Sequence, residues 1–283
     1  METGAAADRG RAGTAALAET WESLAGVCNG LRAEDWARPT GCPGWCVQDH
    51  LSHLIGLERS LLGELPPTFD EPFGDHVRNP FAEENEPWIA VRRSTPGPDV
   101  LTEFVAVTQF RLATLRRLTE DEWAQVGPTI VGEVALADFM RTRVFDSWVH
   151  EQDVRLAVGR PGGSGGLASA IGVDQVEAAM GFVVGKKAAA PEGSVVRFSV
   201  TGPAQDARRI TLAVQDGRAR PVAEGPSAVA TVPTVTLGLS SIDFVRLGCG
   251  RVAAGELEAA GGVEVRGDAA LGKKILEAMN FMF

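Results

Sequence analysis

The sequence predicts an α+β protein of two domains, a four-helix bundle at residues 1–163 and a smaller α+β domain at residues 164–283. Up to Val158, apolar residues recur mainly at the spacing of helices. After Ser194, short runs in which Val, Phe and Thr alternate with polar residues are typical of strands. A segment rich in Pro and Gly, residues 161–166, separates the two patterns and is the expected domain boundary.

Composition agrees with a folded protein and limits its partners. The chain has 283 residues, 45% of them hydrophobic and 23% charged, which is enough apolar material for one large core or two ordinary ones. We expect order throughout except at the extreme N-terminus. The formal net charge of -10 argues against a nucleic-acid partner, because contacts to phosphates need clustered Lys and Arg.

The cysteines and the hydropathy of the chain indicate its cellular compartment. Four cysteines are too few and too scattered for a disulfide framework, which favours a reducing compartment. The first residues lack the apolar core of a secretory signal, and no stretch approaches 18 uninterrupted apolar residues. We therefore expect a cytoplasmic protein without a membrane partner.

Each element of the first domain follows from spacing and from breaker residues. The helices are expected at about Ala15–Leu31, from the Cys42-Pro-Gly turn to just before Pro66, at Asp99–Leu118 and at Leu136–Val158. Four such helices form a bundle. Between Pro66 and Pro98 the sequence is rich in Pro and acidic residues without periodicity, so we expect a long ordered loop over the bundle.

The second domain is expected to mix helices and short strands. One helix is expected at Val173–Ala189, followed by strands at Ser194–Thr201, Arg208–Val214 and Val229–Leu237. Two further helices, Ser241–Leu247 and Ala269–Met282, complete an α+β domain.

Histidine is scarce, which narrows the choice of candidate site. The chain holds only four, His50, His53, His76 and His150. Asp146 and His150 are four residues apart on one helix, so they share a face and could hold one metal ion. An imidazole from His50 or His53 would complete a three-ligand set with an open position. The apolar stripe of that helix slightly favours His50.

Ordinary structural roles compete with these interpretations. An Asp–His pair at this spacing is more often a surface hydrogen bond than a metal site. Cys42 and Cys46 could form a second metal site or a redox pair, but structural zinc usually takes four ligands, so Cys42 is expected to pack beside the turn. Asp153 either orients an imidazole or pairs with neighbours. Trp45, Trp123 and Trp148 could line a cavity, although a core position is the commoner fate.

Two motifs carry a family resemblance. Residues 36–56, with Cys42-Pro-Gly-Trp45 followed by His53-Leu-Ile-Gly56, resemble the signature of the mycothiol-dependent maleylpyruvate isomerase family, a branch of the DinB-like metal-binding four-helix bundles. Residues 143–155 resemble the family's fourth-helix motif, and residues 261–272 are similar to the end of its C-terminal α+β domain. The resemblance therefore covers nearly the whole chain.

The resemblance implies a ligand set. It assigns the metal to His53, Asp146 and His150, with zinc as the first choice, and it leaves His50 outside the pattern. Where the family usually has Glu, this chain has Asp146. That side chain is shorter by one methylene, which could change the metal, its distance or its coordination number.

The resemblance also implies a chemistry. It predicts mycothiol as a thiol cosubstrate whose thiolate, deprotonated by the metal, attacks a small electrophilic substrate. Addition, rotation and elimination would give cis-trans isomerisation, and addition or displacement alone would give S-transfer. An arginine of the second domain would hold a substrate carboxylate, and Arg246 and Arg251 are the candidates.

Two other functions remain open at the level of sequence. The scaffold could serve a non-catalytic metal-binding, ligand-binding or regulatory protein, which the change to Asp146 allows. Hydrolysis by metal-activated water would need a general base, and no convincing one stands out.

Overall fold

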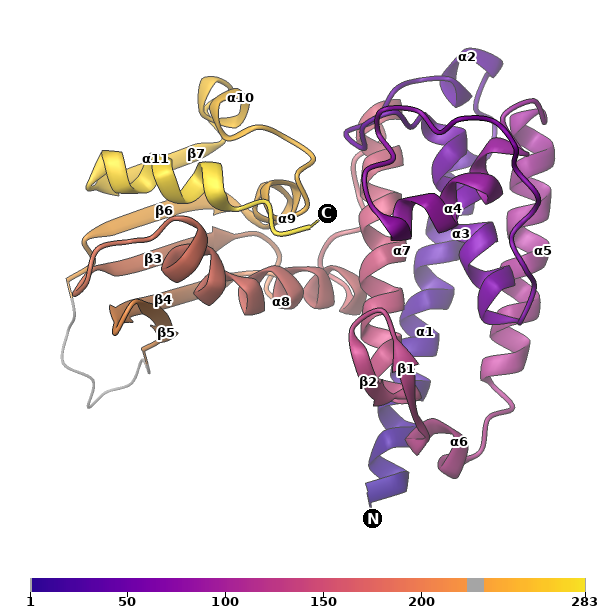
Figure 1. The fold of residues 1–283 in the computed structure, drawn as a ribbon, viewed down its shortest axis with the longest axis horizontal. Helices are drawn as coiled ribbons and strands as arrows, with labels where there is room; N and C mark the ends of the chain where they lie inside the picture. The colour runs from indigo at the N-terminus through magenta and orange to yellow at the C-terminus, as the bar shows by residue number, and fades with distance from the viewer. Residues whose placement is uncertain (1, 223–231, 283) are drawn as a thin grey trace. The chain divides into compact units, whose positions relative to one another are not determined.

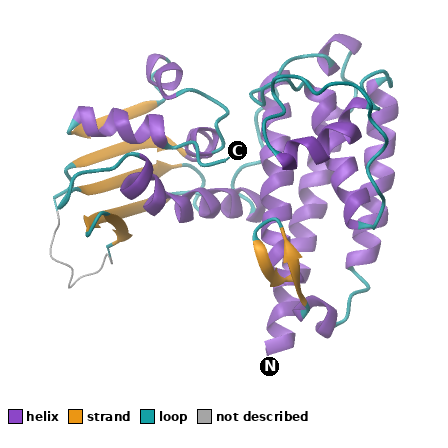
Figure 2. Ribbon diagram, in the orientation of Figure 1, coloured by secondary structure: helices purple, strands orange, loops and turns teal. Residues whose placement is uncertain are grey.

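The computed structural model describes residues 2–222 and 232–282 and divides the chain into two compact units, Met1–Gly163 and Ser164–Phe283. The first unit is helical except for one short hairpin, and the second combines a mixed sheet with helices (Figure 2). The predicted fold class, a helical bundle followed by an α+β region, is confirmed.

Four long helices build the first unit. They are α1 (Glu2–Cys28), α3 (Val47–Leu61), α5 (Gly97–Leu115) and α7 (Leu136–Val158). Helix α1 packs along α7, and α3 packs against α5 and α7 (Figure 1). Helix α7 ends at Gly159, whose φ of 66° is the left-handed conformation that glycine adopts most easily. The contact between α3 and α7 positions the candidate site.

Shorter elements complete this unit. They are α2 (Ala33–Trp36), α4 (Pro80–Ala90), α6 (Glu120–Ala124), β1 (Val126–Thr129) and β2 (Gly132–Ala135). Strands β1 and β2 pair antiparallel as a hairpin just before α7.

The first helix is longer than predicted. The expected start near Ala15 is wrong, because α1 begins at Glu2. Disorder at the extreme N-terminus was expected too, but residues 2–14 are helical, and Met1 lies outside the described residues. The added turns carry small residues, which leave a weak hydrophobic signal but allow close packing. A Cβ on Gly10 would lie 2.3 Å from the Trp123 ring, and one on Gly13 would lie 2.7 Å from Met140.

The segment predicted as a loop between Pro66 and Pro98 contains a helix. Helix α4 starts where the Asn79 side chain accepts a hydrogen bond from the Ala82 amide at 2.8 Å, with proline in the first turn. Trp88 packs against Gly56 of α3, where a Cβ would lie 2.4 Å from the indole. The interpretation as a loop is therefore wrong for residues 80–90.

The second unit contains a five-stranded sheet in the order β5-β4-β3-β6-β7 (Figure 1). The strands are β3 (Val195–Thr201), β4 (Arg208–Gln215), β5 (Arg218–Pro221), β6 (Val235–Ser240) and β7 (Val263–Gly267). Strands β3 and β6 are parallel, and the other neighbours are antiparallel. The sequence did not predict β5 and β7, and residues 229–231 of the third predicted strand lie outside the described residues.

Helices cover the apolar face of this sheet. They are α8 (Leu167–Phe182), which continues as the π-helical turn η1 (Val183–Lys187), α9 (Ser241–Gly248), α10 (Ala254–Ala259) and α11 (Ala269–Ala278). Alternation along β3 buries Val196, Phe198 and Val200, and it turns Arg197 and Ser199 toward the other face. The core of this unit lies between that apolar face and the helices.

One helical stretch, Leu167–Lys187, is long and apolar enough to span a membrane by length and composition. Its most apolar window is 44% buried inside this unit. Val176, Met180 and Val184 on this stretch are fully buried, which is typical of a core helix.

Candidate metal centre

Three side chains that lie far apart in the sequence converge between α3 and α7. His53 comes from α3, and Asp146 and His150 come from α7. One ligand atom from each lies within 4.8 Å of the others. The Nε2 atoms of His53 and His150 each lie 3.5 Å from Oδ1 of Asp146. The geometry thus brings together the three residues that the family resemblance assigns to a metal.

The surroundings of His53 fit a cation better than a hydrogen bond. Its side chain is 3% exposed, and neither ring nitrogen has a hydrogen-bond partner among the described residues. A separation of 3.5 Å is longer than a normal N–H···O bond. In tetrahedral zinc sites, bonds near 2.0–2.1 Å place ligand atoms about 3.3 Å apart. The donor set of two imidazoles and one carboxylate also suits zinc.

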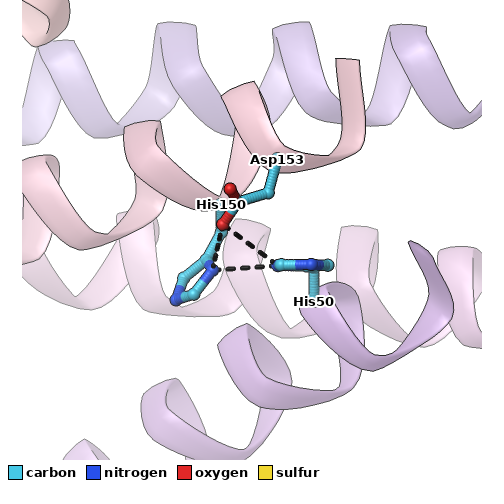
Figure 3. Close-up of side chains that lie close together, drawn as sticks. All are labelled: His50, His150 and Asp153. Atoms are coloured by element: carbon cyan, nitrogen blue, oxygen red, sulfur yellow. Dashed lines mark hydrogen bonds and ion pairs between the residues drawn. The ribbon is translucent and has the colours of Figure 1, made fainter. Parts of the chain in front are cut away.

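A second cluster shares one of these histidines. His50 of α3 and Asp153 of α7 flank His150 on its other side (Figure 3). The two Nδ1 atoms of His50 and His150 are 2.9 Å apart, and Oδ2 of Asp153 lies 3.4 Å from Nδ1 of His150. His150 therefore presents Nε2 to Asp146 and Nδ1 to this second cluster. His50, which helical spacing had slightly favoured as a ligand, contacts the ring nitrogen that faces away from Asp146.

Buried arginine holds Asp146 in its charged form. Arg143 is 3% exposed, and its Nη1 donates to Oδ2 of Asp146 at 2.9 Å while its Nη2 donates to Glu58 at 2.6 Å. Burial alone would raise the pKa of the Asp146 carboxyl, but the positive charges of Arg143 and of the two histidines outweigh burial and hold that pKa well below its usual range. Oδ1 is left facing the imidazoles.

The two candidate imidazole ligands differ in proton affinity. Burial lowers the pKa of His53 below its ordinary value. Burial also acts to lower the pKa of His150, but Asp146 and Asp153 outweigh it and raise that pKa. His53 therefore loses its proton more readily than an ordinary histidine, and His150 holds its proton more tightly.

These shifts predict how metal binding depends on pH. Both imidazoles must be neutral to ligate, so a cation and the proton of His150 compete. The pKa of His150 is raised above the ordinary histidine value of about 6.5. As pH is lowered, zinc affinity should therefore begin to fall while the pH is still above about 6.5. Chelator competition at a series of pH values measures this, and an affinity that does not change between pH 8 and pH 6 would contradict it.

The turn before α3 places Trp45 over the histidines. The centroid of its ring lies 5.3 Å from that of His50, 5.2 Å from that of His53 and 5.5 Å from that of His150. The turn needs glycine at position 44, because φ is +78° there and a Cβ would lie 2.4 Å from the His76 ring. By contrast, Trp123 and Trp148 are core residues, each 1% exposed.

The other candidates fall outside this cluster. Neither group of potential metal ligands in the described part of the chain includes Cys42 or Cys46. Arg246 donates to Asp243 at 2.8 Å, and Arg251 donates to the Cys249 carbonyl at 3.0 Å, both within the second unit. Their role toward a substrate carboxylate remains a prediction.

Sequence reasoning offered Asp153 as a residue that could orient an imidazole, and Asp153 lies 3.4 Å from Nδ1 of His150. It did not assign such a supporting role to His50 or Arg143, although some signals were present. His50 precedes His53 by three residues, and Arg143 precedes Asp146 by three, so each shares a helix face with a predicted ligand. No local pattern pointed to Thr40, whose hydroxyl contacts His50.

Comparison with known proteins supports the family resemblance. Residues 17–155 match the family model described as mycothiol maleylpyruvate isomerase N-terminal domain, and residues 183–280 match the SCP-2 sterol transfer family. The resemblance predicted from the two motifs is thereby confirmed. No curated protein matches the chain.

The solved structures that the chain matches include two of the mycothiol-dependent maleylpyruvate isomerase. A histidine-to-alanine mutant of it is 16% identical, with a TM-score of 0.49, and covers 94% of this chain and 93% of its own. The other is 17% identical, with a TM-score of 0.46 and the same coverage. Sterol carrier protein 2 like 2 from Aedes aegypti is 18% identical, with a TM-score of 0.30, and covers 38% of this chain and 95% of its own.

Proposed function

We propose that this chain, which belongs through residues 17–155 to the mycothiol maleylpyruvate isomerase N-terminal domain family, is a metal-dependent enzyme that uses a low-molecular-weight thiol. In this proposal His53, Asp146 and His150 hold one divalent cation, zinc first among the candidates. The thiol is mycothiol, the substrate is a small electrophile, and the protein acts in the reducing cytoplasm.

The observation that carries the proposal is the buried imidazole of His53, which lies beside Asp146 and His150 and whose ring nitrogens make no hydrogen bond within the described part of the chain. Three protein ligands are fewer than the four of a closed structural zinc site, which leaves room for an external ligand. A cation held there would lower the pKa of a coordinating thiol and favour its thiolate near neutral pH.

The residues around the ligands support an external thiol. The Asp146 side chain is 23% exposed, whereas those of His53 and His150 are 3% and 7% exposed. The thiol would therefore approach beside Asp146, while Trp45 shields the histidine rings. Arg143 keeps Asp146 ionised and occupies Oδ2, so that Oδ1 is the oxygen free to ligate.

Two reactions are compatible with such a site. A thiolate that adds to a conjugated double bond forms a C–S bond and converts the double bond to a single bond, which can rotate before the thiolate leaves. This sequence gives cis-trans isomerisation, and addition or displacement without departure of the thiolate gives S-transfer. Arg246 and Arg251 stay proposed as holders of a substrate carboxylate.

Metal content and thiol binding test the proposal together. Purified protein should contain about one equivalent of a divalent metal by elemental analysis. Calorimetry should show mycothiol binding to the zinc-loaded protein and much weaker binding after chelation, and a screen of activated alkenes should then yield isomerisation or conjugation. Protein that takes up no stoichiometric metal would refute the site. Metal without thiol binding would instead support a non-catalytic, metal-binding role.

A further inference from the structure

We infer that His50 and Thr40 are positioning residues that fix His150 in the tautomer whose Nε2 lone pair faces Asp146. The inference rests on the proposed metal site and assigns a role to a histidine outside the family motif. It concerns a chain of hydrogen bonds from the turn before α3 to the ligand on α7. Figure 3 shows its inner part, His50, His150 and Asp153.

The contact between His50 and His150 must contain one proton. Their Nδ1 atoms lie 2.9 Å apart and both rings are buried, with His50 0% exposed. Two bare lone pairs at that distance would repel, and so would two N–H groups. One nitrogen therefore donates and the other accepts.

The role of His150 sets the direction of this bond. A neutral imidazole has one N–H and one lone pair. If Nε2 uses its lone pair toward a cation beside Asp146, Nδ1 of His150 carries the proton and donates to His50. Nε2 of His50 then carries a proton too, and it lies 2.8 Å from Oγ1 of Thr40, which can accept it.

The hydroxyl of Thr40 completes the chain. It accepts from the Cys42 amide at 3.2 Å and lies 3.3 Å from the Trp45 carbonyl, to which it can donate. Its oxygen thus accepts from an amide and from His50 and donates its own proton to the backbone. Every group from the turn to His150 is satisfied in this arrangement, so the turn before α3 supports the tautomer that a cation at Nε2 of His150 requires.

Asp153 adds an electrostatic preference. Its Oδ2 lies 3.4 Å from Nδ1 of His150 and 3.8 Å from Nδ1 of His50. A carboxylate at that place favours a proton between the two nitrogens. Hydrogen bonds of this kind to the far nitrogen of a ligating histidine orient the ring and raise its basicity.

A second cation between His50, His150 and Asp153 fits less well. The separation of 2.9 Å is that of a direct hydrogen bond, and Nε2 of His50 is already paired with Thr40. Neither ring nitrogen of His53, by contrast, is hydrogen-bonded to any residue in ranges 2–222 and 232–282. The two clusters therefore have different roles, one of ligation and one of support.

Four variants test the inference, with zinc affinity from chelator competition as the readout. His50→Leu removes the acceptor and should weaken zinc binding by about 10- to 100-fold. His50→Asn offers an oxygen near the position of Nδ1 and should restore much of that loss. Thr40→Val should weaken binding, whereas Thr40→Ser should not. Thr108→Val is the control for the loss of a threonine hydroxyl, because Thr108 is buried and donates to the Phe104 carbonyl within α5, away from the histidines.

Nitrogen NMR of the zinc-loaded wild-type protein gives a test that requires no variant. His150 should show a protonated Nδ1 and a metal-shifted Nε2. Ligation through Nδ1, two equivalents of zinc per chain, or unchanged affinity in folded His50→Leu and Thr40→Val would each overturn the inference alone. A wild-type protein that binds no zinc would remove the proposed site and the inference with it.

Discussion

Arg143→Gln is expected to lower the free energy of unfolding of the first unit by about 3–5 kcal/mol, the usual cost of removing one partner from a buried ion pair. Arg143 lies between Glu58 and Asp146, donating to both, and Glu58 is only 1% exposed. Without the guanidinium, both carboxylates lose a charged donor. Glu58 keeps Arg111 at 3.0 Å, and Asp146 keeps the two longer contacts to His53 and His150 at 3.5 Å.

Tryptophan fluorescence during denaturant unfolding measures this effect. All six tryptophans lie between residues 21 and 148, so the signal follows the first unit and not the second. Arg9→Gln is the matched control, because Arg9 forms an exposed pair with Asp138 and should cost less than about 1 kcal/mol. If Arg143→Gln lost as little stability as Arg9→Gln, Arg143 would not stabilise the fold through its buried ion pairs with Glu58 and Asp146. Adding Glu58→Gln should recover part of the loss, because the unpaired charge is then removed as well.

The long helices of the first unit could be predicted from the sequence because they combine apolar spacing with clear terminal signals. The helix predicted at Leu136–Val158 agrees with α7, and Gly159 provides its end. The start of α1 could not be predicted, because Gly10 and Gly13 pack through the absence of side chains, which a hydrophobic pattern does not register. Helix α4 was signalled by Asn79 and Pro80, but the Pro-rich context favoured a loop.

The candidate site was predictable only in part. The sequence indicated which residues are candidate ligands, but it could not show which ring nitrogen of each histidine faces which neighbour. Spacing placed Asp146 and His150 on one helix face, and the family motif selected His53. Neither could show that His150 uses opposite nitrogens toward Asp146 and His50. That choice depends on how α3 and α7 pack, and the contact between Arg143 and Glu58 depends on the same packing.

His53→Ala is expected to abolish stoichiometric zinc binding and, with it, the stabilisation that zinc provides. A ligand in thousandfold excess over its Kd stabilises the folded state by about 4 kcal/mol. Removing one of three protein ligands should bring this gain close to zero. Thermal unfolding with and without zinc, together with elemental analysis, measures both effects. His76→Ala is the control, because His76 pairs with Glu86 outside both clusters and should keep the full gain.

Comparing metal-free wild type with metal-free His53→Ala distinguishes a metal ligand from a packing residue. In a purely structural role, a buried histidine would be hydrogen-bonded, and its loss would destabilise the protein equally with and without zinc. The ring nitrogens of His53 instead lack hydrogen bonds to the residues that the structure describes, which costs about 1–3 kcal/mol. Alanine would remove that cost but would lose packing contacts. These opposing effects should leave the metal-free variant close to the metal-free wild type. If His53→Ala lost the same stability with and without zinc, His53 would be a packing residue. A metal ligand, by contrast, adds stability only when the cation is bound.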